Sequence, residues 1–241
     1  MKIVNKVIDI IDKILNFVIY ALFLLLLAFG IYCIQNNLSI LDESNLPKDI
    51  VKLRPTTDFN LKELQKINPD IVGWVTIRNN NVDYPIVKSA DNLEYLNKNY
   101  KQEFSLAGSI FMDYRNSSDK LDYYTVLFGH NMEKNKMFSD INDYQNDGYI
   151  DTHSRGTIFV GNEKHNFTMY AFMNVDGYDE EIYNINHYTD GLTDHVIEKI
   201  KNLSVVYRDA PVDTTSKIVL FSTCSRSDEK KRSVAVAVID K

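Results

Sequence analysis

The chain has 241 residues, enough for one good-sized domain with appendages. Its composition, 44% hydrophobic and 25% charged, is that of an ordinary globular protein, and its 15 Tyr and 12 Phe favour β-strands around a well-filled core. The net charge of −6 argues against a nucleic-acid-binding surface.

An uninterrupted apolar segment lies near the N-terminus. Residues 17–34 read FVIYALFLLLLAFGIYCI, and no charged residue occurs between Lys13 and Asp42. A run of about 18–20 apolar residues is long enough to cross the hydrocarbon core of a bilayer. The run ends without a small-x-small cleavage site, which indicates an uncleaved anchor rather than a signal peptide. A buried core helix is the alternative.

The charges around this run predict its orientation. Lys2, Lys6 and Lys13 precede it, so the positive-inside rule places the N-terminus in the cytoplasm. We therefore expect a single-pass protein of the cell membrane with its main domain outside. The expected parts are a cytoplasmic N-terminus (1–13), a transmembrane anchor (14–34), a polar stalk or linker (35–58) and an extracellular domain (59–241).

Short segments rich in β-forming residues follow the stalk. Strands are expected over 72–77, 82–87, 109–112, 124–128, 157–161, 167–175, 217–223 and 232–239. Helices are expected over about 60–67, capped by Asp58, over about 136–144, and over 193–203. About eight short strands with few helices predict a mainly β fold, either a closed barrel or a sandwich.

The chain has two cysteines, Cys33 in the apolar run and Cys224 near the C-terminus. They cannot pair if one lies inside a membrane and the other outside it. An unpaired extracellular thiol is a candidate reactive group. A free cysteine is equally often a small buried hydrophobe, so both interpretations stand at this point.

The C-terminal segment KIVLFSTCSRSDEKKRSVAVAVID, residues 217–240, consists of two apolar runs around a charged loop. Paired as an antiparallel hairpin, the runs place Cys224 opposite Arg232, whereas Arg226 falls in the loop. A guanidinium beside a thiol can stabilise a thiolate or an oxyanion. The alternative is that these charged residues only form a solvated loop.

A cysteine nucleophile also needs a proton-transfer partner, usually histidine. Among the five histidines, His130 differs from the others because it follows an apolar strand and Gly129. A structural histidine with satisfied hydrogen bonds is the alternative. The chain contains no HExxH, CxxC, GxSxG or phosphate-binding loop, so neither a metal nor a cofactor is expected.

Taken together, these segments resemble the sortases, surface transpeptidases of Gram-positive bacteria, and class B sortases in particular. The resemblance rests on GSIFMDYRN (108–116), VLFGHNM (126–132) and STC (222–224), in that order, and on the helices expected ahead of the barrel and before the cysteine strand. It covers the chain from about Asn60 to the end. It implies a closed eight-stranded β-barrel with an N-terminal helical extension and a helix inserted before the cysteine strand.

The resemblance also implies a Cys–His–Arg site. Cys224 is then the nucleophile, His130 the general acid and base, and Arg232 the stabiliser of the oxyanion or of the substrate backbone. Ser222 and Thr223 would line the substrate groove. The helix near 193–203 is expected to form one wall of that groove.

The implied reaction is acyl transfer. The thiolate attacks the Thr carbonyl of an Asn-Pro-X-Thr sorting motif in a secreted protein, and an amine from a peptidoglycan precursor or cross-bridge resolves the thioester. These two substrates are the expected partners, with no nucleic acid. Three alternatives remain: a pilin-polymerising sortase, an extracellular cysteine protease, and a membrane-anchored binding module with an inert cysteine.

Overall fold

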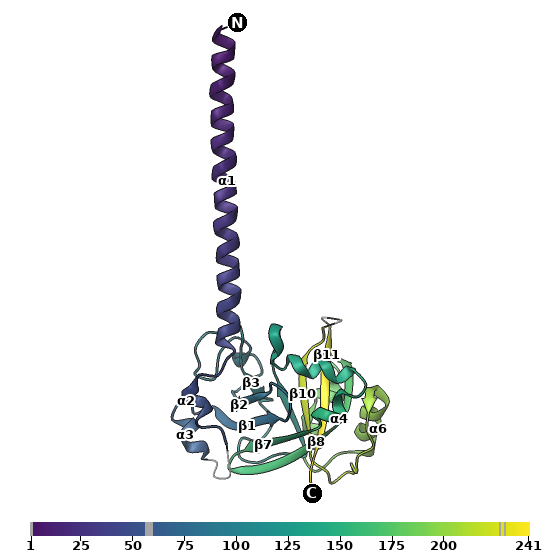
Figure 1. Cartoon of the computed structure of the whole chain (residues 1–241). Coiled ribbons are helices and arrows are strands. Elements are labelled where there is room, and N and C mark those ends of the chain that lie inside the picture. The colour runs from purple at the N-terminus through teal and green to yellow at the C-terminus, as the bar shows by residue number, and fades with distance from the viewer. Residues whose placement is uncertain (1, 56–59, 227, 229) are drawn as a thin grey trace. The chain divides into compact units, whose positions relative to one another are not determined.

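The chain divides into two units, Met1–Asp42 and Glu43–Lys241, in a computed structural model. The structure describes residues 2–55, 60–226, 228 and 230–241. The first unit is formed by helix α1 (Lys2–Glu43), whose last residue belongs to the second unit (Figure 1). Within the described residues, α1 is the one helix long and apolar enough to cross a membrane, judged by length and composition.

Helix α1 is longer than its apolar run. At about 1.5 Å per residue, a helix of 42 residues extends roughly 63 Å, about twice the thickness of a hydrocarbon core. It therefore continues past residues 17–34 into the segment 35–58 that the sequence predicts to be a stalk.

The rest of that segment belongs to the second unit, and part of it packs into the core of that unit. Helix α2 (Lys48–Val51) follows Pro47, and its Ile50 is fully buried in a cluster that also contains Leu64 and Trp74. Helix α3 (Leu61–Gln65) starts at Asn60, whose side chain accepts a hydrogen bond from the Lys62 amide at 3.1 Å. Asp58, the cap expected from the sequence, lies outside the described residues.

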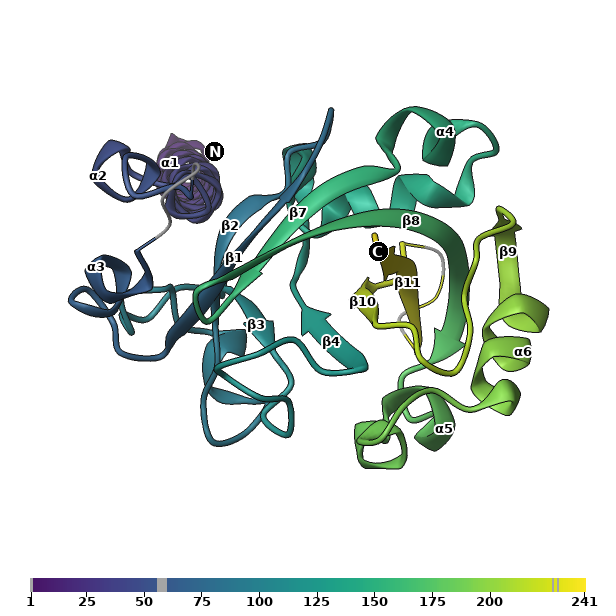
Figure 2. The same ribbon diagram turned by 90° about the horizontal axis from the view of Figure 1, so that it is seen from below.

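Eight strands close into a mixed β-barrel, as predicted (Figures 1 and 2). Their order around the ring is β11 (Lys231–Ile239), β10 (Ile218–Cys224), β4 (Tyr124–Phe128), β3 (Ile110–Met112), β2 (Asp83–Val87), β1 (Ile71–Ile77), β7 (Arg155–Val160) and β8 (Glu163–Asp176). Pairing of β11 with β8 completes the ring, and β9 (Ser204–Tyr207) adds to the edge of β8. Two short strands, β5 (Asn131–Met132) and β6 (Lys136–Met137), form a separate hairpin.

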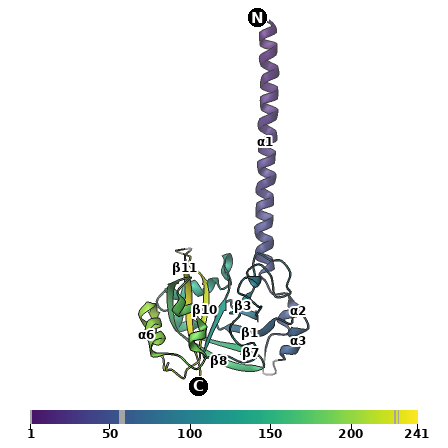
Figure 3. The same ribbon diagram turned by 180° about the vertical axis from the view of Figure 1, so that it is seen from behind.

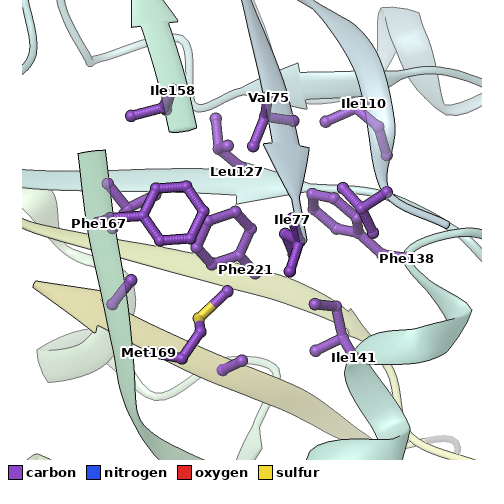
Figure 4. Close-up of a cluster of buried hydrophobic side chains, with 14 of the residues drawn as sticks. Val75, Ile77, Ile110, Leu127, Phe138, Ile141, Ile158, Phe167, Met169 and Phe221 are labelled. Atoms are coloured by element: carbon purple, nitrogen blue, oxygen red, sulfur yellow. The ribbon is translucent and has the colours of Figure 1, made fainter. Parts of the chain in front are cut away.

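Alternation along β10 divides its side chains between two cores. Val219 and Phe221 point into the barrel, where Phe221 packs against Phe138 and Phe167 (Figure 4). Ile218 and Leu220 point outward into a second cluster of buried side chains. Because successive side chains of a strand face opposite sides, Cys224 shares the outward face with Leu220 and not the barrel interior.

The second cluster lies between β10, β11 and the helices that precede β10. Helix α6 (Asp194–Leu203) is capped by Thr193, whose hydroxyl accepts from the Val196 amide at 3.2 Å, and it buries Val196 and Ile200. This confirms the helix predicted over 193–203 (Figure 3).

The other helical segments are short. The helix predicted near 136–144 is the 3-10 helix η3 (Ser139–Gln145), which begins after β6. Five further segments are not expected from the sequence: η1 (Glu94–Leu96), η2 (Glu133–Asn135), α4 (Tyr149–His153), α5 (Glu180–Tyr183) and η4 (Ile185–Tyr188). Each has three to five residues, which is too short to show a helical repeat of apolar side chains.

Candidate active site

A cavity of about 560 Å³ opens beside the ends of β4 and β10. Its volume lies in the range typical of sites that hold a small molecule or a few residues of a peptide. The lining residues are Asn92, Leu93, Leu96, Phe111, Asp113, Arg115, Phe128, Gly129, His130, Gly177, Tyr178, Tyr183, Ser222, Thr223, Cys224 and Arg232. All five residues expected at the site from the sequence are therefore brought to one cavity.

Parallel pairing explains why a histidine and a cysteine far apart in sequence arrive together. Strands β4 and β10 run in the same direction, with Phe128 paired to Ser222. His130 and Cys224 each lie two residues beyond this pair, so both leave the sheet at the same end. The Gly129 amide donates to the Ser222 carbonyl at 3.2 Å and extends the pairing by one step.

Cys224 and Arg232 face each other across the β10–β11 hairpin, which confirms the predicted register. The neighbouring residues Ser225 and Lys231 are linked by a backbone hydrogen bond of 3.1 Å. In an antiparallel ladder this makes Cys224–Arg232 a non-hydrogen-bonded pair, the type whose side chains lie closer together. The Arg232 guanidinium donates from Nη1 to the sulfur of the half-buried Cys224.

Arg226, the other arginine near the thiol, is held elsewhere. Its Nη1 donates to Asp143 Oδ1 at 2.7 Å and its Nη2 to the Ser139 carbonyl at 2.9 Å, both in η3. Of these two arginines, Arg232 therefore donates to the sulfur, whereas Arg226 makes structural contacts with η3.

His130 is positioned by two close approaches of the backbone. Its Nε2 lies 2.6 Å from the Leu96 carbonyl oxygen, and because a carbonyl only accepts, Nε2 carries the proton in this contact. A Cβ on Gly108 would lie 2.9 Å from His130 Cδ2, and Gly108 has a φ of +61°. A Cβ on Gly129 would lie 2.5 Å from the Ile110 side chain. Glycine at position 108 therefore makes room for the imidazole, and glycine at position 129 avoids a clash with the Ile110 side chain.

Ser222 lies two residues before the thiol on the same face of β10. Its hydroxyl is 2.9 Å from the Tyr183 hydroxyl. Burial raises the pKa of Tyr183 to about 12, so this phenol stays protonated at neutral pH and keeps a hydrogen to donate. Thr223 also lines the cavity, although only 2% of its surface is exposed.

The cavity lining also carries an ion pair to which sequence reasoning assigned no role. Asp113 accepts from Arg115 Nε and Nη2, each at 2.8 Å, and from Asn92 at 2.9 Å. Burial acts to raise the pKa of Asp113, but the hydrogen bonds from Arg115 and Asn92 outweigh it and lower the pKa below its usual value. Both charged residues belong to the GSIFMDYRN segment. The sequence analysis used this segment to recognise the family but did not predict the ion pair within it.

The expectation that the helix over 193–203 forms a wall of the groove is wrong. On that side the lining residues are Gly177, Tyr178 and Tyr183, from the end of β8 to α5. Helix α6 supports this wall indirectly, because Lys199 donates to Asp179 at 2.8 Å and to Glu181 at 2.7 Å.

Among the residues that the structure describes, no group of three or more His, Cys, Asp or Glu side chains is placed to hold a metal ion.

Comparison with known proteins identifies the family. The sortase domain model matches residues 75–240. Sortase B of Listeria monocytogenes is 33% identical over 238 residues, covering 94% of this chain and 95% of that protein. The chain belongs to the class B sortases. It is accordingly a cysteine transpeptidase.

Two further relatives extend the comparison. Sortase B of Staphylococcus aureus is 31% identical over 183 residues, 75% of this sortase and 74% of the relative. The crystal structure of a Streptococcus pyogenes class B sortase involved in pilus biogenesis superposes with a TM-score of 0.69 at 29% identity, covering 77% of this chain and all of the other. Sortases are cell-surface enzymes that join proteins bearing a sorting motif to amines, and the apolar helix α1 fits a membrane anchor.

The Asp113–Arg115 pair predicts how the stability of this sortase depends on pH. A carboxyl whose pKa is lower in the folded than in the unfolded protein stabilises the fold above its unfolded pKa, and this stability is lost as the pH falls through the folded pKa. We expect the free energy of unfolding to fall between about pH 5 and pH 2, and to fall less steeply in Asp113→Asn.

Urea unfolding at a series of pH values measures this slope. The matched control Asp190→Asn, at an exposed position, should keep the wild-type slope, and an unchanged slope in Asp113→Asn would contradict the assignment.

Proposed function

We propose that this sortase cleaves secreted proteins after the Thr of an Asn-Pro-X-Thr type of motif and joins them to a peptidoglycan amine. The observation that carries the proposal is that Cys224, His130 and Arg232 line one cavity, and that the Arg232 guanidinium donates a hydrogen bond to the Cys224 sulfur. These three residue types suffice for acyl transfer through a thioester.

In the first half-reaction, the Cys224 thiolate attacks the Thr carbonyl carbon. Arg232 holds this sulfur through one guanidinium N–H, and a second N–H can donate to the oxygen that becomes negative in the tetrahedral intermediate. His130, protonated, gives its proton to the leaving amine as the peptide bond breaks. The product is a thioester between the Thr carbonyl and the Cys224 sulfur.

The second half-reaction reverses these roles. The acceptor amine attacks the thioester carbonyl while His130 removes its proton. Collapse of the intermediate forms the new amide bond and releases the Cys224 thiolate, so the enzyme returns to its starting state without a net change in protons. Arg232 stabilises the oxyanion in both directions.

The lining of the cavity supports a motif of mixed polarity. Leu93, Leu96 and Tyr183 supply apolar surface on which a proline ring packs, and Asn92 and Arg115 supply hydrogen-bonding groups for an amide side chain. Ser222 and Thr223 lie next to the thiol, where the Thr of the motif would bind.

Membrane anchoring would bring both substrates to the enzyme. In our proposal residues 14–34 span the membrane, residues 1–13 lie in the cytoplasm and residues 59–241 lie outside. The length of α1 supports the membrane span. The three lysines before the apolar run support the orientation. A secreted donor and a lipid-linked acceptor then meet the site at the same membrane face.

Pilin polymerisation is the second candidate function. It is favoured by the similarity to a Streptococcus pyogenes class B sortase involved in pilus biogenesis. The donor chemistry would be the same, but the acceptor amine would be the side chain of a pilin lysine. Membership in a transpeptidase family does not support the protease or binding-module alternatives.

The two arginines near the thiol should differ sharply in importance. Loss of an oxyanion donor typically costs about 10²–10³ in rate, so Arg232→Ala should lower kcat/KM by that factor. Arg226→Ala should have a modest effect because its guanidinium binds η3. Steady-state kinetics with a sorting peptide measures both variants. The reverse ranking would contradict the assigned roles.

Product analysis tests the proposed reaction itself. The full-length chain in detergent micelles is incubated with an Asn-Pro-X-Thr peptide and an amine bearing either Gly or diaminopimelate. Mass spectrometry should detect cleavage after Thr and a new Thr–amine amide, and neither product in Cys224→Ala or His130→Ala. A lysine-bearing pilin-type acceptor distinguishes the second candidate. Hydrolysis alone at saturating concentrations of every amine would leave the protease interpretation standing.

A further inference from the structure

A buried amide side chain lies behind the proposed nucleophile. Asn142, in η3, is 2% exposed, and its Nδ2 donates to the Cys224 carbonyl at 3.3 Å and to the Ser139 carbonyl at 3.5 Å. Its Oδ1 accepts from the Arg226 amide at 3.1 Å and from the Ser233 hydroxyl at 2.8 Å. One side chain therefore contacts the nucleophile's own backbone, the loop after it and the strand that carries Arg232.

Neither neighbouring strand supplies a hydrogen-bond donor to the Cys224 carbonyl. In a non-hydrogen-bonded pair the backbone N–H and C=O groups point away from the opposite strand, so this carbonyl cannot bond to β11. On its other side, pairing with β4 ends at Ser222, two residues earlier. The Asn142 amide takes the place of the missing strand at this position.

The contact of Asn142 with β11 is also next to a residue of the site. Ser233 follows Arg232 directly in β11, is 1% exposed, and directs its hydroxyl to Asn142 and also to Asn174 Oδ1 at 3.0 Å. A serine hydroxyl has one hydrogen, so these two amide oxygens share it. The last residue of β10 and the beginning of β11 are thus fixed to a single point on η3.

We propose that Asn142 is a positioning residue for transpeptidation, holding the Cys224 sulfur at the Arg232 guanidinium. It does not line the cavity, and it acts through its hydrogen bonds to the two strand ends. A sulfur displaced by about 1 Å from its productive position can lose roughly 10²-fold in rate, so a hydrogen bond to this carbonyl matters to catalysis. The proposal rests on the roles given above to Cys224 and Arg232.

Asn142→Asp separates a positioning role from a packing role. The substitution keeps the size of the side chain and one oxygen that can still accept from Arg226 and Ser233. It replaces the donor to the Cys224 carbonyl with an oxygen that repels it, and it adds a negative charge that disfavours the nearby thiolate. Asn142→Ala removes all four hydrogen bonds, and Asn174→Ala is the matched control because it removes only the alternative partner of Ser233.

The experiment uses the full-length chain in detergent with Cys33→Ser, so that Cys224 is the remaining thiol. Two quantities are measured: kcat and KM for the sorting peptide with an amine, and the rate of iodoacetamide alkylation as a function of pH. Thermal unfolding checks that each variant is folded. We expect Asn142→Asp and Asn142→Ala to lower kcat about 10²-fold with little change in KM. Asn142→Asp should also move the alkylation profile to higher pH.

Asn174→Ala should stay near the wild type in both measurements. A folded Asn142→Asp variant with the wild-type kcat and alkylation profile would overturn the proposal, as would an equal loss in Asn174→Ala. If no sorting peptide were turned over by the wild type, the proposed substrate would be wrong. The alkylation profile, which needs no peptide, would still decide the role of Asn142.

Discussion

The pairing of Cys224 with Arg232 across the β10–β11 hairpin is the contact on which the site depends. It is a non-hydrogen-bonded pair on the outward face of the sheet, so a thiol and a permanently charged guanidinium lie side by side without help from a loop. Both strands are buried on both faces, since their alternate side chains fill the barrel interior and the cluster beneath α6. A slip of one residue would place Cys224 in the barrel interior, which explains why this register is strongly specified.

The rest of the fold brings the other groups to this pair. Parallel pairing of β4 with β10 carries His130 to the same end of the sheet as Cys224, although the two are distant in sequence. Segments outside the ring complete the cavity: η1 bears Leu96, whose carbonyl accepts a hydrogen bond from the imidazole, and α5 bears Tyr183. The barrel thus provides the alignment of the reacting groups, and its short insertions provide the walls.

Period-two alternation predicted the hairpin register, whereas strand counting left a barrel or a sandwich open. The closed barrel and the five residues that meet at the cavity were predicted by the resemblance to sortases, which rests on motifs in a fixed order. The sequence did not predict the cavity walls. Helix α5 is a single turn, so its sequence shows no periodic pattern of apolar residues. Helix α6 is long enough to show such a pattern, and it was therefore predicted to form the wall. Asp113 and Asn142 were missed for another reason. Asn142 acts through a hydrogen bond to Cys224, far along the chain, and Asp113 accepts hydrogen bonds from both its near neighbour Arg115 and the distant Asn92. Spacing alone does not reveal either set of contacts.

The most direct test of this account is whether a cysteine at position 232 forms a disulfide with Cys224. In a non-hydrogen-bonded pair the Cα atoms lie about 4.5 Å apart, within the range of about 4.4–6.8 Å that a disulfide accepts. The full-length chain with Cys33→Ser and Arg232→Cys is oxidised in air and analysed by mass spectrometry without reduction. The account predicts an intramolecular disulfide in Arg232→Cys and free thiols in the matched Arg226→Cys variant. A disulfide from position 226 together with free thiols in Arg232→Cys would contradict it.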